Sequence, residues 1–101
     1  MTVTFVNRFH LNGAPEDFER AFSETADFVS RQPGLLRFTL SQDVQNSGNY
    51  VNVALWVDAQ SLRAVVAHPE FRGHVESLRA LATSEGTVYS DRFTSVGAAL
   101  E

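Results

Sequence analysis

The chain has no cysteine among its 101 residues, and this absence narrows the chemistry available to it. Disulfide bonds, thiolate metal sites, thioester catalysis and cysteine-ligated iron–sulfur clusters all require the missing thiol. No basic segment followed by an apolar one opens the sequence, so nothing in it indicates secretion. We therefore expect a cytoplasmic protein.

Long apolar runs and an excess of basic residues are missing as well. The longest apolar stretches, such as Val51–Val57, fall far short of the roughly 20 residues that span a bilayer, and Asn52 interrupts that one. Twelve acidic residues outnumber eight basic ones, which gives a formal net charge of −4. Such a chain has no electrostatic reason to bind a phosphate backbone, so we expect neither a membrane nor a nucleic-acid partner.

Motifs for the common cofactors are also absent. The sequence has no phosphate-binding loop, no dinucleotide fingerprint and no nucleophile elbow. His10, His68 and His74 lack acid-rich company, and no pair of them has the i, i+4 spacing of a helical metal site. The sequence therefore predicts neither a metal nor an organic cofactor.

What the sequence does contain is typical of one soluble domain spanning residues 1–101. Hydrophobic residues make up 44% and charged residues 20%, which argues against disorder. The aromatic residues comprise eight Phe, two Tyr and one Trp, so we expect a bulky interior that can surround a flat ligand.

Propensity and periodicity predict alternating strands and helices. Val3–Leu11 is rich in β-branched and aromatic residues, and Pro15 suits the first turn of a helix that Gln32-Pro33-Gly34 ends. Asp58 can cap a short helix that His68-Pro69 breaks. The remaining elements are expected as strands at Leu35–Asp43, Tyr50–Val57 and Thr87–Thr94, and as a helical piece marked by Phe71, Val75 and Leu78.

This order, β-α-β-β-α-β, predicts a ferredoxin-like α+β fold in which both helical regions cover one face of the sheet. Along Tyr50–Val57, one face carries the only Trp and the other carries an aliphatic row. That row is Val51, Val53, Leu55 and Val57. Because it would otherwise leave a large apolar patch in water, we expect a second copy of the sheet to cover it in a homodimer.

Three polar groups fall on positions that should face the protein's own helices. Asn7 shares a strand face with Phe5 and Phe9, and Asn52 and Trp56 project from the same side, roughly 13–14 Å apart along the strand. A buried amide is costly without a hydrogen bond. Either each Asn satisfies a backbone group at a bulge, or the two bind the phenol and carbonyl oxygens of a ligand with three or four rings; the residues alone leave both readings open.

Segments along nearly the whole chain resemble the antibiotic biosynthesis monooxygenases, and among them most of all the anthrone oxygenases of aromatic polyketide pathways. These segments are Thr4–Phe9, Gly13–Pro15, Gln32–Gly34, Tyr50–Trp56, Leu78–Leu81 and Thr83–Glu85. The resemblance implies a dimeric α+β barrel that oxidises an anthrone-like methylene of a polycyclic aromatic polyketide to a quinone with O₂. It implies neither metal nor flavin.

The resemblance also implies the site residues. The functional residues of the family fall on Asn7, Asn52 and Trp56, which we expect to be catalytic. We expect substrate contacts from Phe5, Phe9, Phe22, Tyr50 and Arg79. In one branch of the family two tyrosines stand where this chain has Leu40 and Leu62, which puts a mechanism with a tyrosine acid in doubt here.

Two other functions are compatible with the same fold. A haem-degrading oxygenase would use His74 as its iron ligand, although the ring-distorting Trp of such relatives would fall at Val65. A non-catalytic dimer that binds a polyketide or assists its cyclisation would need a similar pocket. Oxygen consumption distinguishes the enzyme from the binding module.

Overall fold

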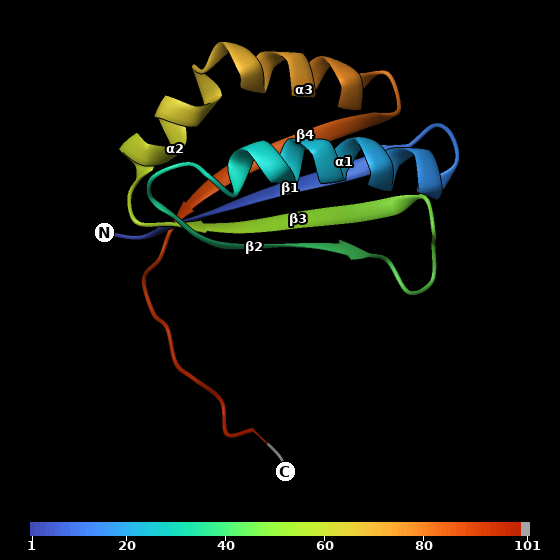
Figure 1. Cartoon of the computed structure of the whole chain (residues 1–101). Helices are drawn as coiled ribbons and strands as arrows, with labels where there is room; N and C mark the ends of the chain where they lie inside the picture. The colour runs from blue at the N-terminus through green and yellow to red at the C-terminus, as the bar shows by residue number, and fades with distance from the viewer. Residues whose placement is uncertain (100–101) are drawn as a thin grey trace.

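A computed structural model of the chain describes residues 1–99. The elements follow the order β1 (Val3–Leu11), α1 (Pro15–Val29), β2 (Leu35–Gln42), β3 (Asn49–Trp56), α2 (Ala59–Val66), α3 (Pro69–Arg79) and β4 (Ala82–Ser90). The strands form one antiparallel sheet in the order β2-β3-β1-β4, and all three helices lie on one face of it (Figure 1). The predicted ferredoxin-like α+β fold is confirmed.

Helix α1 forms where the sequence predicts it. Pro15 occupies the first turn, where its missing N–H costs nothing, and the helix buries a stripe at helical spacing against the sheet. That stripe is Phe18, Phe22, Thr25 and Phe28. The chain then reverses at Gly34, whose φ of 93° lies in the left-handed region that favours glycine.

Two separate caps divide the second helical region into α2 and α3. The Asp58 carboxylate accepts a hydrogen bond from the Ser61 N–H at 2.8 Å at the start of α2. His68 Nδ1 accepts from the Glu70 N–H at 3.1 Å at the start of α3, and Pro69 cannot continue the preceding helix. The predicted break at His68-Pro69 is confirmed. Among the described residues, no helix is both long and apolar enough to cross a membrane.

The last strand differs from the sequence prediction. We expected it at Thr87–Thr94, but β4 spans Ala82–Ser90. The polar segment at its start has little β propensity of its own, yet it pairs with the central strand β1 from Leu11↔Ala82 to Val3↔Ser90. Backbone hydrogen bonds to β1 therefore outweigh local propensity, and the chain leaves the sheet four residues earlier than predicted.

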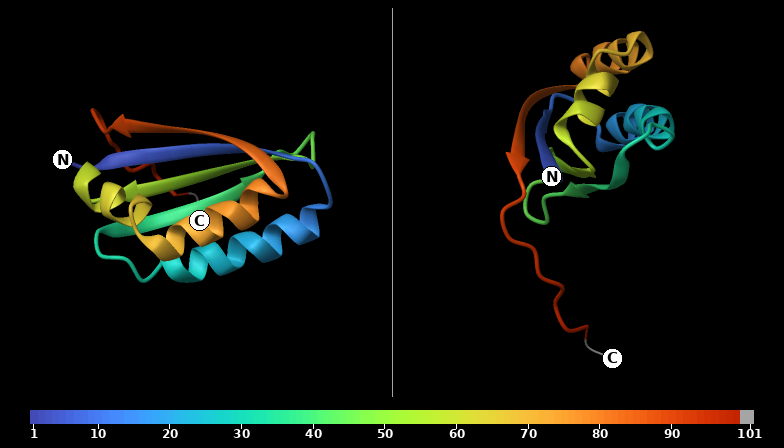
Figure 2. Two further views of the ribbon diagram at one scale, coloured as in Figure 1. Left: turned by 90° about the horizontal axis from the view of Figure 1, so that it is seen from above. Right: turned by 90° about the vertical axis from the view of Figure 1, so that its left-hand side faces the viewer.

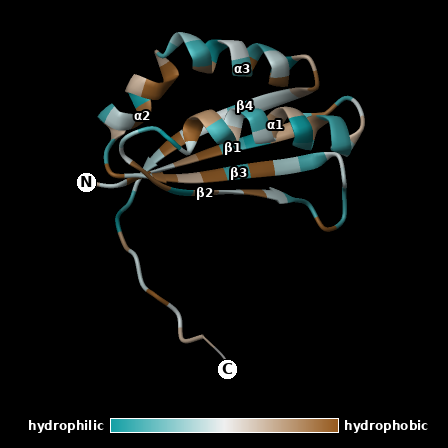
Figure 3. Cartoon of the chain, in the orientation of Figure 1, coloured by the Kyte–Doolittle hydropathy of each residue, from teal (hydrophilic) through white to brown (hydrophobic). Residues whose placement is uncertain are grey.

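The two faces of the sheet differ in burial. On the face toward the helices, Tyr50, Ala54 and Trp56 of β3 are all buried, as predicted. On the opposite face, which we call the outer face, Val53 and Val57 are 40% and 39% exposed. Hydrophobic residues recur along the central strands (Figure 3). After β4 the chain runs away from the sheet on the side opposite the helices (Figures 1 and 2).

Candidate active site

A cavity of about 390 Å³ lies between the inner face of the sheet and the three helices. We call it the inner cavity. Its size falls within the range of small-molecule sites, and most of its walls are apolar. Every strand and helix contributes lining residues, which include Phe5, Asn7, Phe9, Phe22, Thr25, Phe38, Asn52, Ala54, Trp56, Val65, Leu78, Arg79, Ser84 and Gly86.

Strand register brings the two predicted asparagines together on the cavity floor. Asn7 of β1 pairs with Asn52 of β3 on one side and with Gly86 of β4 on the other. Side chains directly opposite each other in an antiparallel pair have Cβ atoms about 4.5–5.5 Å apart. Both amides can therefore reach one ligand atom or two adjacent ones.

Three polar atoms in this cavity are buried without a hydrogen-bond partner. They are the Asn7 Oδ1, the Asn52 Oδ1 and the Trp56 Nε1. Each such group costs about 1–3 kcal/mol, and buried polar groups in native proteins are almost always paired. The amide oxygens do not satisfy backbone groups, so the bulge reading is wrong for them. Each of the three atoms is therefore free to form a hydrogen bond with a polar ligand in the cavity.

Trp56 is the last inward-facing residue of β3. Its side chain is only 2% exposed, and the sole residue between it and Asn52 on the same face is the small Ala54. Because Ala54 has a small side chain, the cavity stays open between the Asn52 amide and the Trp56 indole. A flat ring system can lie across this floor with a polar group at each end.

The predicted aromatic contacts divide into two groups. Phe5, Phe9 and Phe22 line the inner cavity, whereas Tyr50 is not among its lining residues. Tyr50 lies one row nearer the β2–β3 hairpin, where it packs on Phe18 and its hydroxyl donates to the Glu19 carboxylate. Burial, followed by the bond to Glu19 and its negative charge, raises the pKa of Tyr50 to about 12. The structure therefore gives Tyr50 a role in the core.

Arg79 lines the inner cavity from the last turn of α3 and is an exposed residue. It is the only ionisable residue among the described residues that line this cavity. A guanidinium at the edge of an apolar site is suited to a carboxylate or phenolate oxygen. This places Arg79 at the mouth.

His74 does not reach the inner cavity. Its ring packs against Phe28, with centroids 5.7 Å apart, and its Nε2 lies 3.5 Å from a carboxylate oxygen of Glu70. Val65, the position of the missing Trp, does line the cavity and is apolar. The haem-degrading reading therefore lacks its iron ligand at the site. Among residues 1–99, no group of three or more His, Asp or Glu side chains is arranged to hold a metal ion.

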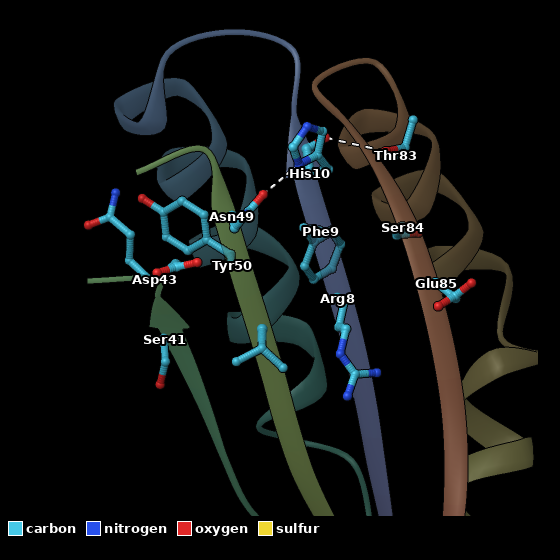
Figure 4. Close-up of a pocket in the computed structure, with 12 residues that line it drawn as sticks. Arg8, Phe9, His10, Ser41, Asp43, Asn49, Tyr50, Thr83, Ser84 and Glu85 are labelled. Atoms are coloured by element: carbon cyan, nitrogen blue, oxygen red, sulfur yellow. Dashed lines mark hydrogen bonds between the residues drawn. The ribbon is translucent and has the colours of Figure 1, made fainter. Parts of the chain in front are cut away.

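A second, larger hollow of about 740 Å³ lies at the hairpin end of the sheet (Figure 4). We call it the hairpin hollow. Its walls carry charged and polar side chains, and most of them are exposed. Polar groups here have partners: the His10 ring is bonded to the Asn49 amide oxygen, and the Thr83 hydroxyl donates to the His10 carbonyl at 3.4 Å. None of the described side chains that line it has a polar atom that is buried without a hydrogen-bond partner.

Thr25, Ser84 and Gly86 are among the lining residues of the inner cavity that sequence reasoning missed. Thr25 is buried on α1, where its hydroxyl donates to the Ala21 carbonyl at 3.2 Å. Ser84 and Gly86 lie on β4, in a segment that the sequence prediction left outside the strand. Thr25 could have been found from its place in the apolar stripe of α1, but the other two depend on the register of β4.

The chain is similar to known proteins over most of its length. The model of the family described as "Antibiotic biosynthesis monooxygenase" matches residues 2–77. Deoxynogalonate monooxygenase from Streptomyces nogalater is 46% identical over 92 residues, which cover 91% of this chain and 78% of that protein. The crystal structure of SnoaB, a cofactor-independent oxygenase from the same organism, has a TM-score of 0.89 at 46% identity and covers 92% of this chain and 95% of its own.

A more distant structure shows the fold alone. A conserved protein from Methanosarcina mazei has a TM-score of 0.82 at only 15% identity, with 91% of this chain and 94% of that chain covered. The family match and the high identity to a monooxygenase confirm both the expected family and the expected enzyme class. The chain belongs to the antibiotic biosynthesis monooxygenase family.

Proposed function

We propose that the chain is a cofactor-independent oxygenase that converts an anthrone-type methylene of a polycyclic aromatic polyketide into a quinone carbonyl with O₂. The observation that carries this proposal is the meeting of Asn7, Asn52 and Trp56 in one apolar cavity, each with a buried polar atom that lacks a partner. The relative named deoxynogalonate monooxygenase and the SnoaB structure described as a cofactor-independent oxygenase support it.

The inner cavity complements a hydroxylated anthrone in shape and in hydrogen bonding. Phe5, Phe9 and Phe22 offer apolar surfaces for flat rings. The two amide oxygens accept hydrogen bonds from phenol groups, and the amide NH₂ groups donate to a carbonyl oxygen. The indole N–H donates to an oxygen at the other end of the ring system. One ligand can thus satisfy all three orphaned atoms.

The first chemical step is ionisation of the substrate. The methylene lies between two aromatic rings and opposite a carbonyl, so loss of its proton gives an enolate delocalised over the ring system. Asn7 and Asn52 donate hydrogen bonds to the developing oxyanion in a largely dry cavity, where such bonds are strongest. Among the described lining residues there is no carboxylate or imidazole, so the site acts by favouring the ionised substrate, and the proton leaves to solvent.

The substrate anion itself supplies the electrons for oxygen. One electron passes from the enolate to O₂, which gives a carbon radical and superoxide. The two combine, and protonation of the peroxide gives a hydroperoxide at the former methylene carbon. Loss of water across the C–H and O–OH bonds then forms the carbonyl, so that CH₂ and O₂ become C=O and H₂O. The Trp56 N–H donates to the peroxide and holds it over the ring.

Arg79 is assigned to an anionic substituent of the substrate. It is the one cation among the described residues of the wall, and it stands at the mouth, away from the three orphaned atoms on the floor. A carboxylate or phenolate on the edge of the ring system would meet the guanidinium there while the carbonyl that becomes the oxyanion reaches Asn7 and Asn52. This orientation places the reacting carbon in the interior.

We also propose that the protein acts as a homodimer joined through the outer faces of two sheets. Val53 and Val57 on that face remain 40% and 39% exposed in the single chain. The segment after β4 leaves the sheet on the same side and carries Phe93 and Val96, which are 91% and 94% exposed. Soluble monomers rarely expose such a large apolar surface to water. A second copy of the sheet would cover it.

The test is oxygen uptake with a model hydroxyanthrone, measured for metal-stripped protein and for Asn7→Ala and Trp56→Phe. We expect catalysed uptake with one quinone formed per O₂ consumed, unchanged by chelators and sharply lower in both variants. Loss of one donor to a developing oxyanion typically costs about a hundredfold or more in rate. Tight anthrone binding without uptake above the spontaneous rate would contradict the oxygenase and favour the binding module.

A further inference from the structure

Gly86 stands in the middle of β4, directly opposite Asn7, although the backbone does not require glycine there. Gly34 is the only described residue with a positive φ, so Gly86 has a conformation that any residue can adopt. Glycine in the interior of a strand is destabilising by roughly 0.5–1 kcal/mol relative to alanine. An explanation for Gly86 must therefore come from the space around it.

That space is occupied by the Phe5 ring. A Cβ atom at Gly86 would lie 2.9 Å from Phe5 Cε1, 3.1 Å from Phe5 Cζ and 3.6 Å from Asn7 Oδ1. By contrast, a Cβ atom at Gly73 on α3 would meet nothing within 4 Å. The ring thus rests over the bare backbone of β4, beside the orphaned amide oxygen.

We propose that Gly86 is a specificity-determining position, which sets the depth of the inner cavity beside Asn7 and so the number of fused rings that the site accepts. This inference rests on the proposed function, because it concerns the substrate of the same site. Gly86, Phe5 and Asn7 all line the cavity, so a change in one alters the space that a ligand has at the other two.

The direction in which the ring would move follows from its surroundings. Phe5 packs against the core cluster around Val3, Phe28 and Trp56 on one side, and β4 lies on another. Its free side is the cavity. A methyl group at Gly86 therefore pushes the ring toward the ligand, and it also narrows the approach to the Asn7 oxygen. The smaller cavity should weaken the binding of a longer ring system more than that of a shorter one.

The experiment compares a tricyclic hydroxyanthrone with a tetracyclic naphthacenone. Trp56, the only Trp of the chain, lies in the cavity, so quenching of its fluorescence under anaerobic conditions reports binding of either ligand. The variants are Gly86→Ala, the double variant Gly86→Ala with Phe5→Leu, and Gly73→Ala as the matched control. Thermal melting checks that each variant is folded, and oxygen uptake is measured in parallel.

We expect Gly86→Ala to weaken binding of the tetracyclic ligand by about tenfold or more, since overpacking typically costs 1–3 kcal/mol. Binding of the tricyclic ligand should change much less. Shortening Phe5 in the double variant should restore the tetracyclic ligand relative to Gly86→Ala, and Gly73→Ala should bind both ligands as the wild type does.

An equal loss for both ligands, no loss for either, or failure of the double variant to recover would overturn the proposal. If Gly86→Ala does not fold while the double variant does, the clash with Phe5 is established directly, and ligand selectivity is then read from the double variant. Selective binding without oxygen uptake in the wild type would sink the oxygenase proposal and leave the role of Gly86 intact.

Discussion

The two faces of the sheet each bear a hollow, and the smaller hollow is the better candidate for chemistry. The hairpin hollow of about 740 Å³ is nearly twice the volume of the inner cavity of about 390 Å³. Its polar groups are either exposed or, like His10 and Asn49, paired. In the inner cavity, Asn7, Asn52 and Trp56 each keep a buried polar atom without a partner.

We therefore rank the two hollows by their unmet hydrogen bonds and not by their volumes. Folding normally removes such orphaned atoms because each one lowers stability. In a surface hollow, the polar groups are already paired or in contact with water, so a ligand adds no net hydrogen bond there. The inner cavity gains three hydrogen bonds and covers apolar walls when a flat polar molecule enters.

The sharpest test exchanges asparagine for alanine on both faces of the same strand, β3. Asn52→Ala should lower kcat for anthrone oxidation by about a hundredfold or more, because it removes a donor to the oxyanion. Asn49→Ala, in the hairpin hollow, should stay within about twofold of the wild type, since it removes only interactions with the exposed residues His10 and Asp43. Steady-state oxygen uptake measures both, and equal losses would contradict the assignment of the site.

A charge on the outer face tests whether that face is an interface. Val53→Glu should weaken the dimer about tenfold or more. In a two-fold interface both copies contribute the same surface, so the two introduced carboxylates would lie near each other and repel. Sedimentation velocity measures the change. Val44→Glu is the control, because Val44 is 99% exposed in the β2–β3 hairpin, outside the sheet. A wild-type protein that sediments as a monomer would refute the dimer.

Removal of one hydrogen-bond donor from an aromatic residue on each face separates the role of the indole N–H from that of aromatic packing. Trp56→Phe keeps a ring in the cavity but loses the orphaned donor, so kcat should fall by roughly tenfold, the effect of one hydrogen bond. Tyr89→Phe removes a hydroxyl from an aromatic residue that is 48% exposed on β4 and outside the cavity, and it should leave kcat unchanged. If Trp56→Phe is equally silent, the indole N–H has no part in the reaction.

The smallest effect concerns Tyr50, which shares the inner face but belongs to the core. Its pKa is raised from 10.0 to about 12 in the folded chain, chiefly by burial and then by Glu19. The unfolded chain therefore loses this proton first, so the contribution to stability is complete below pH 10 and is lost as pH rises toward 12. The melting temperature should fall across this window, and the fall should be smaller for Tyr50→Phe.

Much of the fold could be predicted because it depends on local interactions. Pro15 at a helix start, Asp58 as a cap and the break at His68-Pro69 each act over a few residues. Strand alternation likewise predicted the inward face of β3, including Trp56. The prediction failed at β4, because the segment from Ala82 is held by its pairing with β1 and its own residues carry little strand signal.

The candidate site was partly predictable for the same reason. Asn7, Asn52 and Trp56 could be identified because amides and an indole on apolar strand faces are conspicuous in the sequence. Tyr50 could not be separated from them, since alternation assigns it to the same face and does not show that α1 covers it with Phe18 and Glu19. Whether Arg79 reached the cavity depended on how α3 packs over the sheet.

The sequence by itself determined the kinds of element, their order and the face on which each polar group lies, because propensity, capping and alternation are short-range effects. Only the tertiary structure decided which groups meet. Asn7 lies between Asn52 and Gly86 because backbone hydrogen bonds join three segments that are far apart in the chain. The cavity is the space that this register and the packing of the helices leave unfilled, so no single segment encodes it.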